Sequence, residues 1–156
     1  MISLPADKLT SIEKDVVAEI RSLRASPDSG PLSALFESPA RLAHHFILAC
    51  HGNVQLRFGT LAGELGVETR TLERTFSAEY QKTMTQFQVE VRLAFSKHLL
   101  SIFPPTKISV IALTLGYELV QDFNRFFKKH MHQSPSEWSH GERQRIAREA
   151  TRAPRN

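Results

Sequence analysis

The sequence holds a single cysteine, Cys50, among its 156 residues. A disulfide needs two cysteines, so a framework of intramolecular disulfides is excluded. Because such frameworks belong to oxidising compartments, we expect a cytoplasmic protein. The longest uninterrupted apolar run, residues 46–50, is far shorter than the roughly 20 residues that cross a bilayer, so no membrane partner is expected. The first residues also lack a basic segment followed by an apolar one, so we expect no secretory signal.

Motifs that carry catalytic or metal chemistry are missing as well. The seven histidines and the one cysteine never adopt the paired spacing of a structural zinc site. The chain has no nucleophile elbow, no phosphate-binding loop and no metalloprotease motif. We therefore expect no metal site, no cofactor and no enzymatic activity.

Positive charge gathers in the later part of the chain. Residues 1–56 contain five Lys or Arg and six Asp or Glu, a net charge of −1. Residues 57–156 contain fifteen and ten, a net charge of +5, so the total is +4. A basic region suits a nucleic-acid partner, although a modest excess is common in cytosolic domains.

The region 108–138 has the pattern of two short helices separated by a tight turn at Gly116. In the second helix, Phe123 and Phe127 are four residues apart and share one face. The polar residues that follow the helical spacing of another face are Gln121, Asn124, Arg125 and Lys128. A helix with one apolar face and one face of hydrogen-bond donors is suited to reading a DNA groove from a packed core.

A second copy of this pattern lies earlier in the chain. Ala62 and Gly66 correspond to Ala112 and Gly116, and the offset grows by one residue after the turn. The later apolar and capping pairs are Leu72 with Phe123, Phe76 with Phe127, Thr83 with Ser134, and Phe87 with Trp138. The polar pairs are Arg70 with Gln121, Glu73 with Asn124, Arg74 with Arg125, and Ser77 with Lys128. We predict two helix-turn-helix units, and we call the second helix of each unit its reading helix.

A long amphipathic run, residues 84–101, separates the two copies. One stripe contains Phe87, Val91, Phe95 and Leu99. A helix of this length spans roughly 25 Å at ~1.5 Å per residue, and successive major grooves on one face of DNA are about 34 Å apart. The stripe is compatible both with ordinary core and with a spacer that lets the two units enter neighbouring grooves.

These residues resemble the DNA-binding region of AraC/XylS-type transcriptional regulators over residues 39–139. The motifs that carry the resemblance are LAGELGVETRTLERTF, VRLAFSKHLL and IALTLGYELVQDFNRFFKKH. The resemblance implies promoter binding, often activation of transcription, and an all-α fold. In that fold, two helix-turn-helix subdomains are joined by a long linker helix, here with an added N-terminal amphipathic helix.

Several positions depart from the family pattern. They are Gln81 and His132 for the usual glycine after each reading helix, Glu68 for a serine cap, Leu119 and Val120 for polar residues, and Ser139 for an arginine. These departures concern local geometry and base preference rather than the fold. Asp122 and Glu68 are expected to cap the starts of the reading helices and to favour the helix dipole there.

The N-terminal helix is expected over residues 8–25, with Leu9, Ile12, Val16, Ile20 and Leu23 in one apolar stripe. Two interpretations stay open: the helix packs back on the domain, or it pairs with a second copy as the arm of a homodimer. We divide the chain into an N-terminal arm and linker (1–38), a double helix-turn-helix domain (39–140) and a basic C-terminal tail (141–156). The tail is expected to be a frayed, solvated end rather than a DNA-binding arm.

The chemistry of the polar face predicts how each residue meets DNA. Arginine suits guanine, Gln and Asn suit adenine, and Glu accepts from the cytosine amino group. The predicted base contacts on these grounds are Arg70, Glu73, Arg74, Gln121, Asn124 and Arg125, and the resemblance adds Val120. Ser77, Lys128 and Lys129 are expected to hold phosphate, which fixes register without reading sequence.

The sequence thus predicts a transcriptional regulator whose partner is double-stranded DNA, and the resemblance makes RNA polymerase a candidate second partner. The alternative is a helical protein-interaction module that has lost specific DNA reading. In that case the N-terminal helix would be its main binding surface. Replacing Arg74 and Arg125 by alanine distinguishes the two, because only a DNA reader loses promoter binding.

Overall fold

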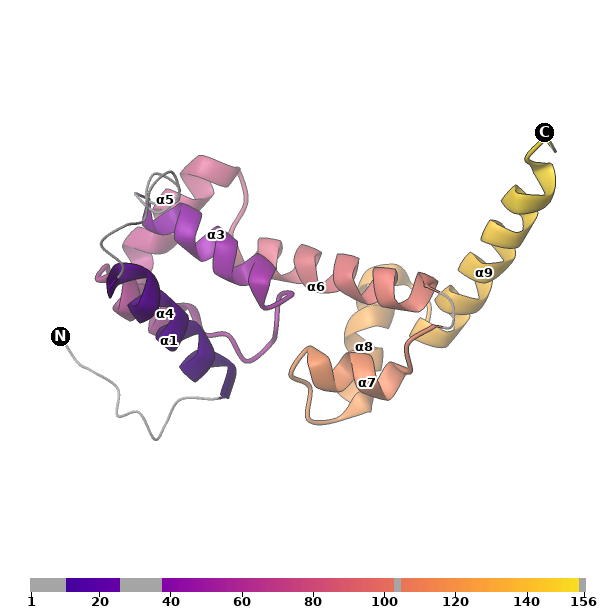
Figure 1. Ribbon diagram of the computed structural model, residues 1–156, viewed down its shortest axis with the longest axis horizontal. Coiled ribbons are helices and arrows are strands. Elements are labelled where there is room, and N and C mark those ends of the chain that lie inside the picture. The colour runs from indigo at the N-terminus through magenta and orange to yellow at the C-terminus, as the bar shows by residue number, and fades with distance from the viewer. Residues whose placement is uncertain (1–10, 26–37, 103–104, 155–156) are drawn as a thin grey trace. The chain divides into compact units, whose positions relative to one another are not determined.

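The computed structural model describes residues 11–25, 38–102 and 105–154, and every regular element in these ranges is an α-helix (Figure 1). The helices are α1 (Ser11–Ala25), α3 (Pro39–Ala49), α4 (Phe58–Leu65), α5 (Thr69–Tyr80), α6 (Met84–Ser101), α7 (Ile108–Thr114), α8 (Val120–Met131) and α9 (Pro135–Arg152). The predicted all-α fold is confirmed. Residues 8–10 of the predicted N-terminal helix and residues 26–37 of the predicted arm and linker (1–38) lie outside the described residues.

No helix in the described parts combines the length and the apolar character that crossing a membrane requires.

The chain forms two compact units, Met1–Val91 and Arg92–Asn156. One helix-turn-helix lies in each unit, formed by α4 and α5 in the first and by α7 and α8 in the second. The helix α6 begins in the first unit and ends in the second. The boundary therefore falls inside the region 39–140 that the sequence predicted as one double helix-turn-helix domain.

The first unit is built on a core between α3, α4 and α5 (Figure 1). Its fully buried side chains include Phe46, Ile47, Leu61, Leu72 and Phe76. A polar contact closes its edge, where Arg41 Nε of α3 donates to Glu79 Oε1 of α5 at 2.6 Å. This hydrogen bond holds the pKa of the Glu79 carboxyl below its ordinary value.

The N-terminal helix α1 packs back on this unit. Val16, Val17 and Ile20 are buried, with exposed fractions of 6%, 5% and 1%. Thr60 Oγ1 of α4 donates to the buried Glu13 carboxylate at 3.3 Å, so the contact is polar as well as apolar. Of the two interpretations of this helix, the structure shows the one in which it is an added helix of the domain.

The turns of the two helix-turn-helix units have the same backbone. Gly66 and Gly116 have φ angles of 72° and 85°, a conformation that only glycine adopts at little cost. One residue later, the N–H of Val67 donates to the Ala62 carbonyl at 3.1 Å, and the N–H of Tyr117 donates to the Ala112 carbonyl at 3.0 Å. These paired hydrogen bonds end each first helix in the same way.

The reading helices also end alike. Gln81 and His132, which stand where the family usually has glycine, keep the left-handed backbone, with φ angles of 59° and 60°. Their N–H groups donate to the carbonyls of Ser77 and Lys128 at 3.0 and 2.9 Å. Both reading helices therefore end in a left-handed residue that is not glycine, which adds backbone strain at two sites.

The similarity extends into the helix that follows each reading helix. Thr83 and Gln86 form a reciprocal capping box at the start of α6, with bonds of 3.1 and 2.9 Å. Ser134 and Glu137 form the same box at the start of α9, with bonds of 3.2 and 2.9 Å. The sequence repeat is therefore a repeat of backbone hydrogen bonds as well as of side-chain types.

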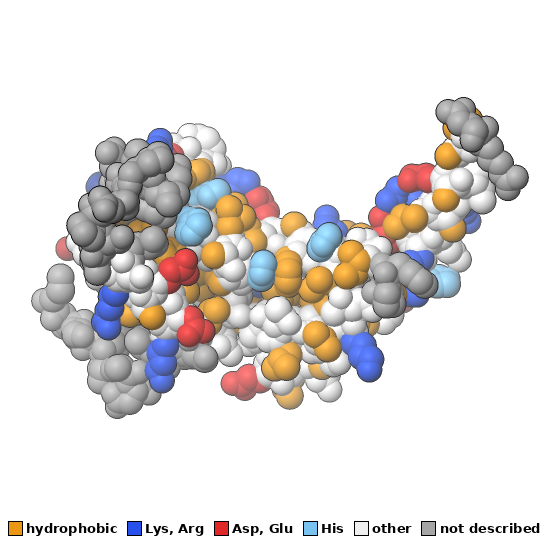
Figure 2. Space-filling view, viewed as in Figure 1, with side chains coloured by type: hydrophobic (Ala, Val, Ile, Leu, Met, Phe, Trp, Pro, Cys, Tyr) orange, Lys and Arg blue, Asp and Glu red, His pale blue; other side chains and the backbone are white. Residues whose placement is uncertain are grey.

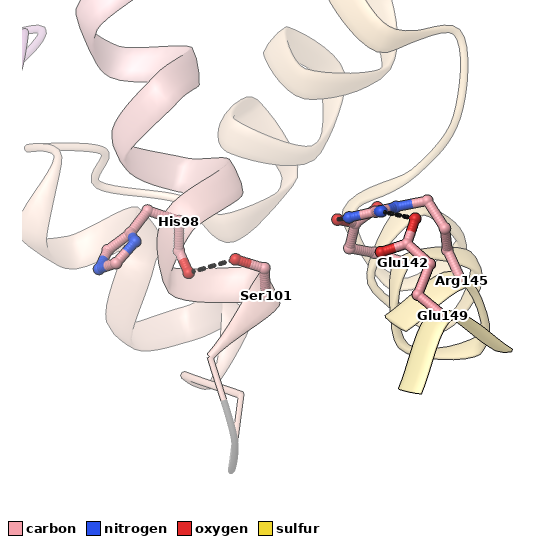
Figure 3. Close-up of polar contacts among 5 residues, drawn as sticks. All are labelled: His98, Ser101, Glu142, Arg145 and Glu149. Carbon is pink, nitrogen blue, oxygen red and sulfur yellow. Dashed lines mark hydrogen bonds and ion pairs between the residues drawn. The ribbon is translucent and has the colours of Figure 1, made fainter. Parts of the chain in front are cut away.

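The second unit packs the end of α6 and the start of α9 against α7 and α8 (Figure 1). Leu100, Ile111 and Leu115 are among its buried residues. Ser139, the replacement for the family's usual arginine, is buried, and its Oγ donates to the Leu100 carbonyl at 3.0 Å. Nearby, Ser101 Oγ donates to the His98 carbonyl at 2.9 Å as α6 ends (Figure 3).

The expectation of a frayed C-terminal tail is wrong for the part that the structure describes, because α9 continues to Arg152. Arg145 donates to both Glu142 and Glu149, three residues before it and four after it (Figure 3). Acidic and basic side chains are interspersed along this helix (Figure 2). These intrahelical ion pairs support a helix that makes few contacts with the core.

The long helix α6 corrects a second expectation. The predicted apolar stripe of Phe87, Val91, Phe95 and Leu99 is only half-buried. The most buried line lies one residue further on and is polar in its middle: Met84, Gln88, Arg92, Ser96 and Leu100. Hydrogen bonds explain how polar groups occupy this line, since Gln88 Nε2 donates to the Asn53 carbonyl at 2.7 Å and Ser96 Oγ donates to the Arg92 carbonyl at 2.7 Å.

The docking of α1 predicts a local loss of stability. Ile20→Ala should lower the free energy of unfolding of the first unit by about 2–5 kcal/mol, because it leaves a cavity in the core. Urea denaturation followed by far-ultraviolet circular dichroism measures the change. Fluorescence of Trp138, the one tryptophan, reports the second unit and should change little. Exposed Glu19→Ala is the control, and an unchanged dichroism curve for Ile20→Ala would refute the docking.

The left-handed residues predict a gain of stability. His132→Gly should raise the free energy of unfolding by on the order of 1 kcal/mol, because glycine relieves the strain of a positive φ. Gln81→Gly should gain less, because it also removes the bond from Gln81 Nε2 to the Ala78 carbonyl. Differential scanning calorimetry compares the two variants, and a melting temperature that falls in both would contradict the assignment.

Candidate nucleic-acid interface

Two phenylalanines orient the second reading helix, α8. Phe123 and Phe127 are 0% exposed, and their ring centroids lie 6.0 Å apart. Because they are four residues apart, they turn one face of α8 into the core and leave the opposite face open. The predicted contact residues on the open face are Gln121, Arg125, Lys128 and Lys129, all of them exposed.

The first reading helix, α5, is oriented in the same way. Leu72 and Phe76 are 0% exposed and occupy the places of the two phenylalanines. Arg70, Glu73 and Arg74 are exposed, and Ser77 is half-buried. Arg74 and Arg125, the repeated pair, are thus both on the surface of their units.

Arg125 already has a partner on its own helix. Its Nη1 donates to Asp122 Oδ1 at 3.2 Å, while 80% of the arginine side chain is exposed. An exposed ion pair of this kind is worth up to about 1 kcal/mol, so Arg125 can exchange this partner for a base or a phosphate. The pair also means that the positive charge of Arg125 is partly balanced before any ligand arrives.

The predicted caps of the reading helices make no side-chain cap hydrogen bond, although both carboxylates lie at helix starts, where the helix dipole favours them. Leu119 is the N-cap of α8, and no side chain makes a cap hydrogen bond there, so Asp122 lies in the first turn without capping it. Glu68 is the N-cap of α5 as expected, but its side chain also makes no cap hydrogen bond. Both reading helices therefore begin with N–H groups that no side chain caps.

Two residues of the predicted set lie at the edge of the open face. Val120 is half-buried and packs against the core of the second unit. Asn124 is half-buried, and its Oδ1 is, within the described structure, a buried acceptor with no hydrogen-bond partner. A desolvated carbonyl without a donor costs about 1–3 kcal/mol. The reading helix thus carries a buried acceptor without a protein donor at a predicted base contact.

The sequence did not predict a role for Arg92, which contacts α8 through the ring of Phe126. This arginine is 7% exposed, and its guanidinium lies 4.8 Å from the ring centroid of Phe126 and 5.9 Å from that of Tyr117. Its Nη1 also donates to the Tyr117 hydroxyl at 3.4 Å. Burial raises the pKa of Tyr117 and, with Lys129 and Arg92 nearby, lowers the pKa of His130.

One signal in the sequence marks this arginine. The offset that relates Arg74 to Arg125 also relates Arg41 to Arg92. In the first unit Arg41 contacts the end of α5 through Glu79, and in the second unit Arg92 contacts α8 through Phe126. Both arginines support the later half of a reading helix, by an ion pair in one copy and by a cation–π contact in the other.

Across the described ranges, no three or more His, Cys, Asp or Glu side chains gather where a metal ion would bind.

Comparison with known proteins shows the same architecture. A family model described as "Helix-turn-helix domain" matches residues 61–141, more than half of the chain. The C-terminal domain of AraT, a response regulator from Geobacillus stearothermophilus, is 24% identical with a TM-score of 0.61 over 67% of this chain and 86% of that one. No curated protein matches the sequence.

Two further solved structures have this fold. The DNA-binding domain of AdpA, a global transcriptional factor solved in complex with a target DNA, is 19% identical with a TM-score of 0.61, over 70% of this chain and 96% of that one. A probable AraC family transcriptional regulator from Rhodopseudomonas palustris is 23% identical with a TM-score of 0.53, over 67% and 96%. Together with the duplicated geometry described above, the match places the chain in the AraC-type helix-turn-helix family of DNA-binding transcription regulators, a family of regulators rather than of enzymes.

Proposed function

We propose that this regulator binds specific sequences in double-stranded DNA and reads two adjacent major grooves, with α5 in one and α8 in the next. The observation that carries the proposal is the repeated open face, with Arg74 on α5 and Arg125 on α8 exposed at matching positions. In each copy, the orientation of this open face is set by two fully buried side chains on the same helix. An ordinary solvent-exposed helix face would not require an arginine at the same place in both copies.

The open faces supply both kinds of contact that groove reading requires. Arg70, Arg74 and Arg125 suit guanine, Gln121 suits adenine, and Glu73 suits the cytosine amino group, each bidentate pair being worth about 1–3 kcal/mol of discrimination. At the edge of α8, Val120 would present its methyl groups to thymine, and Asn124 would pair with adenine after its side chain turns to bring the buried Oδ1 to the surface.

Phosphate contacts would set the register of each helix. Lys128 and Lys129 are exposed in the last turns of α8, and Ser77 occupies the matching region of α5. The uncapped starts of both reading helices add backbone N–H donors. These contacts raise affinity for every sequence alike, so specificity rests on the base contacts.

The proposed groove spacing rests on the length of α6. Its 18 residues span roughly 25 Å at ~1.5 Å per residue, which is of the same order as the ~34 Å between successive grooves. The AdpA domain, which has the same fold, was solved with a target DNA, and this supports a DNA partner for the present chain.

We further propose that the protein acts in the cytoplasm as an activator that contacts RNA polymerase, and that it binds DNA as a monomer. A homodimer through residues 8–25 would have to remove α1 from α4, because Val16, Val17 and Ile20 are already buried there. The alternative of an interaction module centred on the N-terminal helix is weakened for the same reason.

Loss of the repeated arginines tests the proposal. A site is first selected from random duplex DNA, and affinity is then measured by fluorescence anisotropy. Arg74→Ala and Arg125→Ala should each lower affinity about 5- to 150-fold, the equivalent of 1–3 kcal/mol. Exposed Arg148→Ala on α9 is the matched control. Wild-type affinity in the double variant, with the helical content intact, would refute DNA reading by these faces.

A lysine variant separates phosphate contact from base reading. Lys128→Ala should weaken binding to all sequences equally and reduce the slope of log affinity against log salt by about 1. Arg125→Ala should in addition relax the preference at one base pair. If Lys128→Ala instead changed the selected sequence, its assignment to phosphate would be wrong.

Asn124 predicts opposite effects on stability and binding. Asn124→Leu should leave the free energy of unfolding unchanged or raise it by up to about 2 kcal/mol, because it removes a buried acceptor that has no donor. The same variant should bind the selected DNA more weakly and lose its preference at one base pair. Urea denaturation and anisotropy measure the two effects. A large loss of stability would show that the carbonyl is satisfied in the folded protein.

A further inference from the structure

In the first unit, an amphipathic helix packs against the first helix of the helix-turn-helix. The outer face of α4 contains Arg57, Thr60 and Glu64, and α1 lies against it. The Glu13 carboxylate accepts from Thr60 Oγ1 and lies 4.0 Å from Arg57 Nε. At the other end, Arg21 Nη2 lies 3.5 Å from Glu64 Oε1. The two helices therefore run in the same direction, with an acid of one meeting the cationic N-cap of the other.

The repeat places an equivalent face on α7. The offset that relates Ala62 to Ala112 takes Arg57 to Lys107. It also takes Thr60 to Val110 and Gly63 to Leu113. Lys107 is the N-cap of α7, as Arg57 is the N-cap of α4, so the cation is kept at the same place. We call Lys107, Val110 and Leu113 the α7 outer face.

The more apolar of the two faces is the one that no helix covers in the part of the chain that the structure describes. Val110 is 47% exposed, and Leu113, at 76%, is the most exposed large hydrophobic residue that the structure describes. Their neighbour Ile111 is 0% exposed, so α7 has one face in the core and a second apolar face outside it. Hydrophobic side chains are visible over α7 in the space-filling view (Figure 2).

The size of this surface argues for a single helix as its occupant. A stable pair of protein copies buries roughly 800 Å² on each side, far more than two aliphatic side chains and one lysine expose. A helix laid in a groove needs only a few anchors at helical spacing. The surface thus matches one amphipathic helix better than a second copy of the chain.

We propose that the α7 outer face is a docking surface for an amphipathic helix of a partner protein, with the chemistry that α1 shows on α4. The partner helix carries an acidic residue in its first turn, which meets Lys107. Apolar residues one and two turns later cover Val110 and Leu113, as Val16 and Ile20 follow Glu13 in α1.

Comparison with α1 also predicts the direction of the partner helix. It predicts one difference between the partner helix and α1 as well. The acid at its first turn lies at the N-terminal end of α7, so the partner runs in the same direction as α7. Thr114 occupies the place of Glu64, which pairs with Arg21 in the first unit. The partner therefore needs no cation at the place of Arg21.

A peptide of residues 11–25 of this chain, labelled with fluorescein, is the probe. The α4 face is filled by the chain's own α1, so the full-length protein offers the peptide its α7 outer face. Anisotropy should show saturable binding that Leu113→Asp lowers at least 10-fold. Exposed Leu48→Asp on α3 is the matched control and should bind as the wild type does. DNA affinity should be unchanged in Leu113→Asp.

A charge exchange tests the polar end of the contact. Glu13→Lys in the peptide should weaken binding to the wild type, and Lys107→Glu in the protein should restore it. Absence of saturable binding would overturn the proposal, and so would binding that Leu113→Asp leaves unchanged. Self-association of the wild type that Leu113→Asp abolishes, seen by sedimentation velocity, would identify a second copy as the occupant and overturn the assignment to a partner protein.

Discussion

The burial of two side chains four residues apart on each reading helix is the constraint on which the interface depends. One residue of a helix corresponds to a rotation of about 100°, so a helix without this anchor would present a different face. Leu72 and Phe76 anchor α5, and Phe123 and Phe127 anchor α8, all at 0% exposure. The buried apolar residues therefore determine the direction in which Arg74 and Arg125 face.

Each reading helix is also fixed by the element that follows it. The ring centroids of Phe76 and Phe87 lie 5.7 Å apart, and those of Phe127 and Trp138 lie 6.0 Å apart. Phe87 and Trp138 both come directly after a capping box, which fixes where the next helix begins. The core, the left-handed turn and the next helix start thus act together on the orientation of one polar face.

Much of this arrangement could be predicted from the sequence, because its signals are local. Glycine at the turn and apolar residues four apart are visible at once, and the repeat doubles each of them. The buried line of α6 was not predicted, since it is polar and its partners are distant in sequence. Gln88 is satisfied by Asn53, and Arg92 by Tyr117 and Phe126.

The placement of α1 and the helix caps depend on contacts that the periodicity of the sequence does not reveal. The apolar stripe of α1 fits a dimer arm as well as an added helix, and the bond between Glu13 and Thr60 is what distinguishes them in the structure. The predicted side-chain cap bonds are not formed, for a related reason. Asp122 is the right residue type near a helix start, but the N-cap of α8 is Leu119, three residues earlier, and the carboxylate of Asp122 accepts from Arg125 instead.

The packing of α1 and α3 means that the folded unit is larger than the region that the family model matches. The family match begins at residue 61, within α4. A polypeptide cut there would lose Phe46 and Ile47 and the cover that α1 gives to α4, so the buried face of α5 would meet water. Any fragment meant to keep the packing of α5 must therefore begin ahead of α3.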